Sequence, residues 1–319
     1  MDCATFVANV GPYPTEEIRL EIAVTTHQAS SARQTFELHH LTDTHMDDRD
    51  FAEKELSERI EHIKNTPNAL WIGGGDYHSL ILPNDPRFQT GGEVVHRLPD
   101  VYVENVTEWF LPIRDKCVGF ATGNHEATIG KYYHRGVGAE VAGKLQIPQL
   151  YLGVRGWMVL RFNLNNRRVA MTAFQYHGWS SGRLKGRKAL QAERDLGAWN
   201  ADALFLGHDH QPYADIWYTE SIRANKGGHA LIQRPRAVIN GGSWTYGQTP
   251  PTPAGVKISR KLSQVPNESW AEGKNFRPQP PAVPYLLVHV DFGNTKSKSD
   301  SRSAGIDFEI RYRGNRFEM

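Results

Sequence analysis

The sequence predicts an α/β protein. Strand-like and helix-like stretches alternate through the middle of the 319-residue chain, and three of the apolar strand-like runs are each followed by a helix-like stretch. This alternation is typical of a sheet with helices packed against it. The chain is long enough to bury a large core in one large domain or two small ones.

The first unit of this pattern is a strand expected at 35–45 and a helix expected at 50–65. Within the helix, Phe51, Leu56, Ile60 and Ile63 recur near one face, and acidic residues come early in the stretch while a lysine comes late. That spacing and that order of charges are typical of an amphipathic helix.

Two further units have the same order. Strands are expected at 68–76 and 117–126, and both end in glycine followed by polar residues. Helices are expected after them, at 103–116 and 136–146.

Beyond these units the pattern changes to a hairpin. Two strand-like stretches flank a turn at Asn165 and Asn166. A helix is then expected at 185–200 and a buried strand at 201–210.

We expect a single domain over residues 1–319. Its motif-bearing core covers 36–245. Residues 245–284 are too rich in proline and polar residues for regular structure, so we expect a surface excursion there. C-terminal strands are expected within 285–319.

Composition excludes several classes of protein. Hydrophobic residues make up 39% of the chain, and no apolar run is long enough to cross a bilayer. The N-terminus lacks the pattern of a signal peptide, so we expect a cytoplasmic protein without a membrane partner. Cys3 and Cys117 are too few for a disulfide framework or a structural zinc site. A formal net charge of +2 neither requires nor excludes a polyanionic partner.

Acidic, amide and imidazole side chains stand where the expected strands stop. The five stretches are TDTH at 42–45, GGGD at 73–76, GNHE at 123–126, FQYHG at 174–178 and LGHDH at 206–210. Ligands of open α/β sheets bind at the carboxyl ends of strands, so we expect these stretches to converge on one site. Imidazole, carboxylate and carboxamide groups without a thiolate suit Mn, Fe, Zn or a similar divalent ion.

Each stretch alone has a simpler interpretation. A single histidine after a strand, such as His177, is more often structural, and Asp76 after three glycines could cap the next segment. The spacing also favours a metal site, because side chains two residues apart in extended chain point the same way. Asp43 and His45 have this spacing, and so do His208 and His210. Together the five stretches predict a metal site.

The order of these stretches, from Asp43 to His210, resembles that of the calcineurin-like metallophosphoesterase superfamily. The resemblance implies a four-layer arrangement, a β-sandwich flanked by helices, with two divalent metal ions at the strand ends. Manganese is the first choice, with Fe, Zn, Co and Ni as alternatives. The implied ligands are Asp43, His45 and His210 for one ion, Asn124, His177 and His208 for the other, and Asp76 bridging both.

The resemblance also implies that His125 acts on the substrate rather than on a metal. Two ions bridged by Asp76 would clamp a phosphoryl group and hold a hydroxide for in-line attack. His125 would then protonate or stabilise the leaving oxygen. Glu126 or Asp209 is expected to orient His125 or a metal-bound imidazole through a hydrogen bond.

The chain departs from the family pattern after Asp76. Many members carry Asp or Arg three residues later, where this chain has Ser79, so support around the metals is expected to differ. His78 is a candidate substrate contact, and the alternative is an exposed loop residue. Its offset from Asp76 differs from that of the DNA-repair nuclease branch, which leaves a nuclease assignment open.

A basic stretch follows His177 and offers candidate contacts to the substrate. Its members are Trp179, Arg183, Lys185, Arg187 and Lys188. Phosphates attract such cations, and Trp179 could stack on a base. The alternative is the solvated start of a helix. A nucleotide or small phosphodiester is expected as substrate, with nucleic acid as a possible partner.

Three functions follow from these residues. The first is a metal-dependent phosphodiesterase, which includes a nuclease, and the second is a phosphomonoesterase acting on proteins or small molecules. The third is a binding scaffold without catalysis, and the full set of ligand types together with His125 counts against it. The sequence does not choose between the first two, and it leaves the oligomeric state open.

Overall fold

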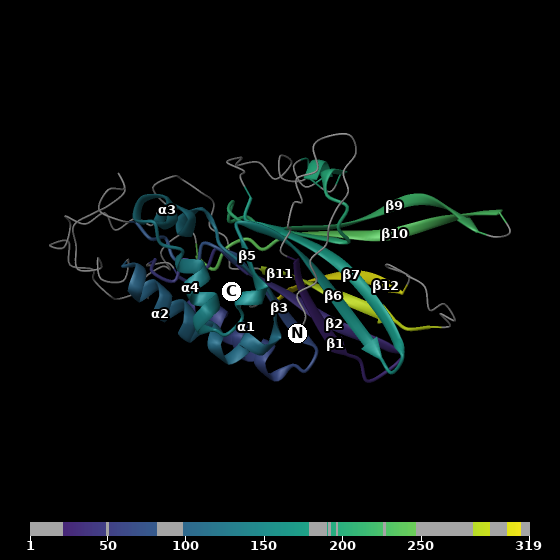
Figure 1. Ribbon diagram of the computed structural model, residues 1–319, viewed down its shortest axis with the longest axis horizontal. Coiled ribbons are helices and arrows are strands. Elements are labelled where there is room, and N and C mark those ends of the chain that lie inside the picture. The colour runs from purple at the N-terminus through teal and green to yellow at the C-terminus, as the bar shows by residue number, and fades with distance from the viewer. Residues whose placement is uncertain are drawn as a thin grey trace, which may run out of the picture.

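A computed structural model shows two stacked β-sheets with helices on their outer faces (Figure 1). The residues it describes are 22–48, 51–81, 98–178, 190, 193–195, 197–225, 228–246, 283–293 and 305–313. Each sheet has six strands, so the predicted α/β sandwich flanked by helices is confirmed. No helix in this described portion is both long and apolar enough to cross a membrane.

Sheet 1 carries the first units of the predicted pattern. In spatial order its strands are β12 (Ile306–Arg313), β11 (Val283–Asp291), β2 (Arg33–Thr42), β3 (Ala69–Gly75), β4 (Cys117–Ala121) and β5 (Tyr151–Gly153). The strands from β2 to β5 are parallel, whereas β11 and β12 run antiparallel to their neighbours. The parallel strands therefore end at one edge of the sheet, where ligands of such sheets bind.

Sheet 2 contains the predicted hairpin. In spatial order its strands are β1 (Ile22–Gln28), β6 (Arg155–Leu164), β7 (Arg167–Tyr176), β8 (Ala203–Leu206), β10 (Gly228–Asn240) and β9 (Tyr213–Asn225). The turn between β6 and β7 has Asn165 in the left-handed region at φ 52°, which asparagine tolerates. Because β7 and β8 are parallel, their ends also lie together.

Helices cover the outer face of sheet 1. They are α1 (Glu53–Asn65), α2 (Pro99–Phe110), α3 (Asn124–Tyr133) and α4 (Val137–Lys144), with short 3-10 helices η2 (Leu111–Lys116) and η3 (Pro148–Leu150). Leu56, Ile60 and Ile63 of α1 are buried, as their spacing predicts. On sheet 2, Trp199 stacks on Phe174 at a ring distance of 4.4 Å, just after helical residues of the helix predicted at 185–200.

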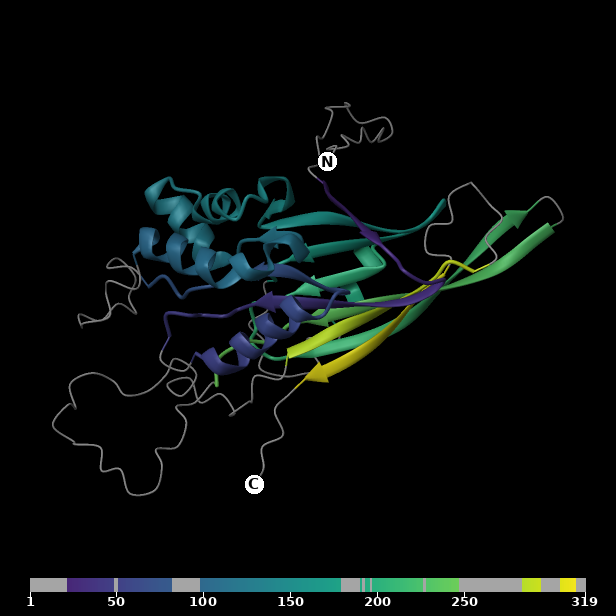
Figure 2. The same cartoon turned by 90° about the horizontal axis from the view of Figure 1, so that it is seen from below.

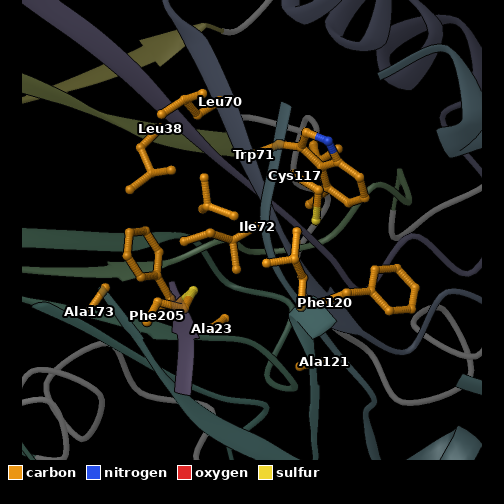
Figure 3. Close-up of a cluster of buried hydrophobic side chains, with 14 of the residues drawn as sticks. Ala23, Leu38, Leu70, Trp71, Ile72, Cys117, Phe120, Ala121, Ala173 and Phe205 are labelled. Atoms are coloured by element: carbon orange, nitrogen blue, oxygen red, sulfur yellow. The ribbon is translucent and has the colours of Figure 1, made fainter. Parts of the chain in front are cut away.

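The core between the sheets is apolar and comes from both of them. Figure 3 shows Leu38 and Ile72 of sheet 1 near Ala173 and Phe205 of sheet 2, and all four side chains are fully buried. Burial of each large apolar side chain contributes about 1.5–3 kcal/mol to stability. This packing holds the two sets of strand ends in a fixed relation.

Several predicted elements differ from the structure in their bounds. The helix expected at 50–65 begins at Glu53, so Phe51 precedes it, and the strand expected at 201–210 is limited to Ala203–Leu206. The strand expected at 117–126 ends at Ala121, and helix α3 begins at Asn124, because the Glu126 carboxylate accepts a hydrogen bond from the backbone nitrogen of Gly123 at 2.7 Å and caps the helix start. The helix expected at 103–116 begins earlier, at Pro99, and its last six residues form η2.

The long β9–β10 hairpin was not predicted. Figure 1 shows it reaching out on the side opposite the four labelled helices, and Figure 2 shows the same projection from below. Most of the surface excursion expected at 245–284 lies outside the described residues, which resume at Val283.

Candidate metal centre

The ends of four strands and the start of one helix bring the predicted site residues together. These residues are Asp43 and His45 after β2, Asp76 after β3, Asn124 and His125 at the start of α3, His177 after β7, and His208 and His210 after β8. Parallel strands explain the convergence, since β2 and β3 end side by side in sheet 1 and β7 and β8 do so in sheet 2.

A first ligand group consists of Asp43, His45 and His210. One ligand atom from each lies within 4.8 Å of the others. The Nε2 atoms of His45 and His210 are 3.0 Å apart, and His210 Nε2 is 3.4 Å from Asp43 Oδ1. Three donor atoms aimed at one small space are suited to one divalent ion.

A second ligand group consists of Asp76, His177 and His208, again with ligand atoms within 4.8 Å of one another. His177 Nε2 is 2.8 Å from Asp76 Oδ2. Asn124 belongs here as well, because its Oδ1 is 2.7 Å from His208 Nδ1. The two groups contain the residues expected for each ion, with Asp76 in the second group only, and their binding of metal stays a prediction.

The two groups adjoin. Asp43 Oδ1 lies 3.9 Å from His177 Nε2, so this carboxylate of the first group also approaches the second. Asp76 is within 3.7 Å of His125 Nε2 and accepts a hydrogen bond from the His125 backbone nitrogen at 2.9 Å. Bridging of two ions by Asp76 stays a prediction.

The backbone is left-handed at five of these positions. The φ angles are 49° at Asp43, 44° at His45, 52° at Asp76, 75° at His208 and 56° at His210. Residues with a Cβ occupy this region at a cost of about 1–2 kcal/mol each. The tight curl after each strand turns the ligand side chains inward, and strain concentrated in this way is typical of functional sites.

Two glycines leave room for the carboxylates. A Cβ at Gly123 would lie 2.1 Å from Asp76 Oδ1, and one at Gly207 would lie 2.5 Å from Asp43 Oδ2. Neither space admits a side chain. The glycines that end the expected strands therefore allow the backbone to approach the ligand atoms.

Asp43 is held by three hydrogen bonds that the sequence analysis did not predict. Its carboxylate accepts hydrogen bonds from Thr42 Oγ1 at 2.6 Å and from the backbone nitrogen of His208 at 3.0 Å, and its carbonyl accepts one from Ser243 Oγ at 2.9 Å. Only the adjacent Thr42 had a local sequence signal. These bonds fix the carboxylate across both sheets.

Backbone carbonyls fix the tautomers of two histidines. The Nδ1–H of His177 donates to the carbonyl of Gly74 at 2.9 Å, and the Nδ1–H of His125 donates to the carbonyl of Ser79. Each leaves Nε2 facing Asp76. A metal-binding imidazole usually has its other nitrogen bonded in this manner.

The buried carboxylates of the site favour binding of a cation. Asp43 and Asp76 are almost completely buried, and within the described residues their ion-pair partners are all histidines. Although burial would raise it, His177 and His210 lower the pKa of Asp43 to about 2. Burial alone would lower the pKa of His177, but the two carboxylates raise it to about 10. Buried carboxylates need compensating positive charge, which divalent ions provide.

Two other histidines have the opposite shift. Burial lowers the pKa of His45 well below its usual value and also lowers that of His208. Both rings are therefore neutral at neutral pH, which is the form that binds a metal. The donor set thus fits a pair of divalent ions.

Glu126 has a different role from the one predicted. Its carboxylate accepts hydrogen bonds from the backbone nitrogens of Asp76 (3.0 Å) and Tyr77 (2.9 Å) and from the Tyr102 hydroxyl (3.1 Å), besides that from Gly123. It orients backbone rather than an imidazole ring. The group that orients His125 is a backbone carbonyl.

Asp209, the other expected orienting residue, bonds within its own sheet. It accepts hydrogen bonds from Asn240 Nδ2 at 3.1 Å and from the backbone nitrogen of Gln211 at 3.2 Å. Its charge contributes to raising the pKa of His210, which burial opposes.

His78 is buried, so its alternative interpretation as an exposed loop residue is wrong, and its surroundings give no support for a substrate contact. The side chain is 1% exposed, its ring packs edge-on against Tyr102, and its Nε2 lies 3.4 Å from Asn105 Oδ1. Both partners belong to α2, so the ring points into the helical layer. The other predicted contacts, Trp179, Arg183, Lys185, Arg187 and Lys188, lie outside the described residues.

A third group with metal-ligand side chains, Glu37, His39 and His62, lies between β2 and α1. Here Arg59 Nη1 donates to His39 Nδ1 at 3.0 Å, so His39 Nε2 must carry the proton and donate to Glu37 at 3.0 Å. A nitrogen that carries a proton has no lone pair for an ion. This group is therefore a hydrogen-bond network within the fold.

Comparison with known proteins gives no family assignment. No family model matches the chain, and no curated protein matches its sequence. A structure from Streptococcus pneumoniae, described as a predicted phosphoesterase, is 11% identical with a TM-score of 0.28 and covers 89% of this chain and 100% of its own. A mutant Vps29 from Entamoeba histolytica is 11% identical with a TM-score of 0.31 and covers 87% and 99%. Similarities this weak carry no inference about function.

Proposed function

We propose that this protein is a phosphoester hydrolase that uses two divalent metal ions and prefers phosphodiesters. The observation that carries the proposal is the pair of adjoining ligand groups, in which buried carboxylates meet imidazole nitrogens at 2.8–3.9 Å. Adjacent sites with oxygen and nitrogen donors are typical of two-metal phosphoester hydrolysis.

Each group would hold one ion. When bound, the ions would clamp the phosphoryl group and supply a nucleophile at neutral pH. The ligands would be Asp43, His45 and His210 for one ion and Asn124, His177 and His208 for the other, with Asp76 shared.

His125 is proposed as the proton donor to the leaving group. Its ring is 15% exposed, its Nδ1–H is bonded to the Ser79 carbonyl, and its Nε2 faces the site 3.7 Å from Asp76 Oδ2. A histidine held in this way can present a proton to an oxygen that leaves from the clamped phosphoryl group.

Turnover of two chromogenic esters tests the reaction. Chelator-treated full-length protein is reconstituted with Mn²⁺ and given bis(p-nitrophenyl) phosphate or p-nitrophenyl phosphate. A higher kcat/KM on the diester is expected. A higher kcat/KM on the monoester would favour the phosphomonoesterase alternative. Absence of turnover of both with Mn, Fe, Zn, Co or Ni would contradict catalysis and favour the scaffold.

A nucleotide or nucleic-acid substrate is the more specific form of the proposal. It depends on the basic stretch of Arg183, Lys185, Arg187 and Lys188, which would contact phosphates beside the scissile one. Replacement of all four by Ser is expected to raise KM for an oligonucleotide while leaving that of a small diester nearly unchanged. The wild-type oligonucleotide KM should rise with salt more steeply than that of the variant. If wild type and the variant had the same oligonucleotide KM at every salt concentration, contact between this stretch and the phosphates would be contradicted.

A further inference from the structure

Ser79 connects one proposed metal ligand with the proposed proton donor. It lies three residues after Asp76 with its side chain 4% exposed, and all its polar groups are engaged. Its hydroxyl oxygen is 2.9 Å from His45 Nδ1, and its carbonyl accepts the Nδ1–H of His125. The residue therefore contacts both rings through different groups.

Two neighbouring aspartates hold Ser79 in place. Its backbone nitrogen donates to Asp47 Oδ1 at 2.5 Å, and the next nitrogen, of Leu80, donates to Asp47 Oδ2 at 3.2 Å. Its hydroxyl donates to Asp48 Oδ2 at 2.8 Å. Asp47 thus fixes the backbone of this turn, while Asp48 acts on the side chain.

The direction of these hydrogen bonds follows from the chemistry of the groups. An ionised carboxylate only accepts, so the single hydroxyl proton of Ser79 must point to Asp48. The lone pair of Ser79 Oγ then faces His45, whose Nδ1 must be the donor. His45 is therefore held as the Nδ1–H tautomer, and the lone pair of its Nε2 faces His210 at 3.0 Å.

We propose that Asp48 and Ser79 form a relay that fixes the tautomer and orientation of His45 for the ion held by the first ligand group. Both act as positioning residues. The carbonyl of Ser79 orients His125 independently of its side chain. This inference rests on the proposed function, and it assigns roles to two residues beside the ligands themselves.

Loss of such a hydrogen bond to a metal-binding imidazole typically weakens metal affinity by about 10- to 100-fold. Ser79→Ala removes the acceptor of His45 Nδ1–H but keeps the carbonyl that holds His125. Asp48→Asn is a second variant of nearly unchanged size. Its amide can donate to Ser79 Oγ, which would turn the hydroxyl proton toward His45 and favour the tautomer that cannot bind a metal.

Calorimetric titration of chelator-treated full-length protein with Mn²⁺ tests the relay. Wild type is expected to bind two ions. Ser79→Ala and Asp48→Asn should each lower the affinity for one ion by about 10- to 100-fold and leave the affinity for the other unchanged. The double variant should be no weaker than Ser79→Ala, because both substitutions break one chain of bonds. Ser79→Thr, which keeps the hydroxyl, should bind both Mn²⁺ ions with the affinity of wild type.

Ser243→Ala is the matched control. It also removes a buried serine hydroxyl beside the first ligand group, but that hydroxyl bonds the carbonyl of Asp43 and no imidazole. A smaller loss of affinity than that of Ser79→Ala is expected. An equal loss would overturn the relay, because any missing hydroxyl would then have the same effect.

A spectroscopic measurement is independent of metal. In metal-free protein labelled with ¹⁵N-histidine, long-range ¹H–¹⁵N correlations report each tautomer, and His45→Gln identifies the His45 signals. Wild type should show the Nδ1–H tautomer of His45, and Asp48→Asn should show an increased Nε2–H population. An Nε2–H tautomer in wild type would overturn the inference.

The outcomes separate this inference from the proposed function. If wild type binds no ions, the proposed function fails. If wild type binds two ions and both variants, shown by urea unfolding to be folded, bind them with wild-type affinity, only the relay is overturned. The ratio of turnover between esters with poor and good leaving groups should not change in Ser79→Ala, because His125 keeps its carbonyl partner. A changed ratio would contradict the separation of the two roles.

Discussion

The carboxylate of Glu126 accepts a hydrogen bond from the backbone nitrogen of Asp76 at 3.0 Å, across 50 residues of sequence. The same carboxylate caps the start of α3, the helix that carries Asn124 and His125. One buried side chain therefore sets the position of a proposed ligand after β3 relative to the proposed proton donor.

Glu126→Gln should lower the free energy of unfolding of the metal-free protein by about 1–3 kcal/mol. Glutamine has one acceptor oxygen, and its amide group would face backbone N–H groups that also donate. Urea denaturation in chelator measures the loss. Tyr102→Phe is the control, since it removes one of the four bonds and should lower stability by only about 0.5–1.5 kcal/mol. A Glu126→Gln protein as stable as wild type would contradict the role given to this carboxylate.

Asp76→Ala should impair binding of both ions, whereas Asn124→Ala should mainly weaken one. Asp76 is close to His177 and to His125, while Asn124 contacts, among the ligand groups of the described residues, the second one through His208. Elemental analysis after reconstitution with Mn²⁺ and dialysis gives the number of ions per chain. Retention of one tightly bound ion by Asp76→Ala would argue that Asp43 is the shared carboxylate.

His125→Ala should keep both ions and lose about 10²–10⁴ in turnover of esters with poor leaving groups. The loss should be smaller for p-nitrophenyl esters, because p-nitrophenolate departs without a proton. Comparison of kcat on the two classes of ester measures the difference. An equal loss on both classes would indicate phosphate binding by His125 instead of proton donation.

Acidification should destabilise the protein through His39. Burial chiefly, with Arg59 adding to it and Glu37 opposing, lowers the pKa of His39 from 6.5 to about 4. As the pH falls through this window the unfolded chain binds a proton that the folded chain does not, so the free energy of unfolding decreases, by at most about 3 kcal/mol. Urea denaturation from neutral pH to about pH 5 should show a shallower decrease in His39→Gln. If the free energy of unfolding decreased equally with pH in wild type and in His39→Gln, the attribution of this decrease to His39 would be contradicted.

The sequence predicts the convergence of the proposed ligand side chains because its signals are local. An apolar run that stops at a glycine before Asp76 or His208 shows where a buried strand ends, and Asp43 directly follows the strand that ends at Thr42. Parallel strands place those ends at one edge. The two-residue spacing correctly pairs Asp43 with His45, but His208 and His210 belong to different ligand groups, because the backbone is left-handed there and not extended. Such information is contained in short stretches of chain.

The remaining features depend on distant contacts. His78 follows Asp76 as a loop residue would, but it is buried because α2 supplies Tyr102 and Asn105 more than twenty residues later. The outer half of the β9–β10 hairpin has exposed apolar residues such as Ile222 and Leu231, so it lacks the alternation that identifies a half-buried strand. No local pattern indicates that Ser79 would meet two histidines.

The left-handed backbone at the ligand positions lowers the stability of the metal-free chain, while the residues at these positions are needed to bind metal. Glycine would relieve the φ of 75° at His208 or of 44° at His45 and stabilise the metal-free chain, while removing a ligand. Selection for stability alone would therefore erase the centre one residue at a time. Directed evolution of this protein for heat resistance, carried out without a screen for metal binding, is expected to accumulate glycine or asparagine at these positions first.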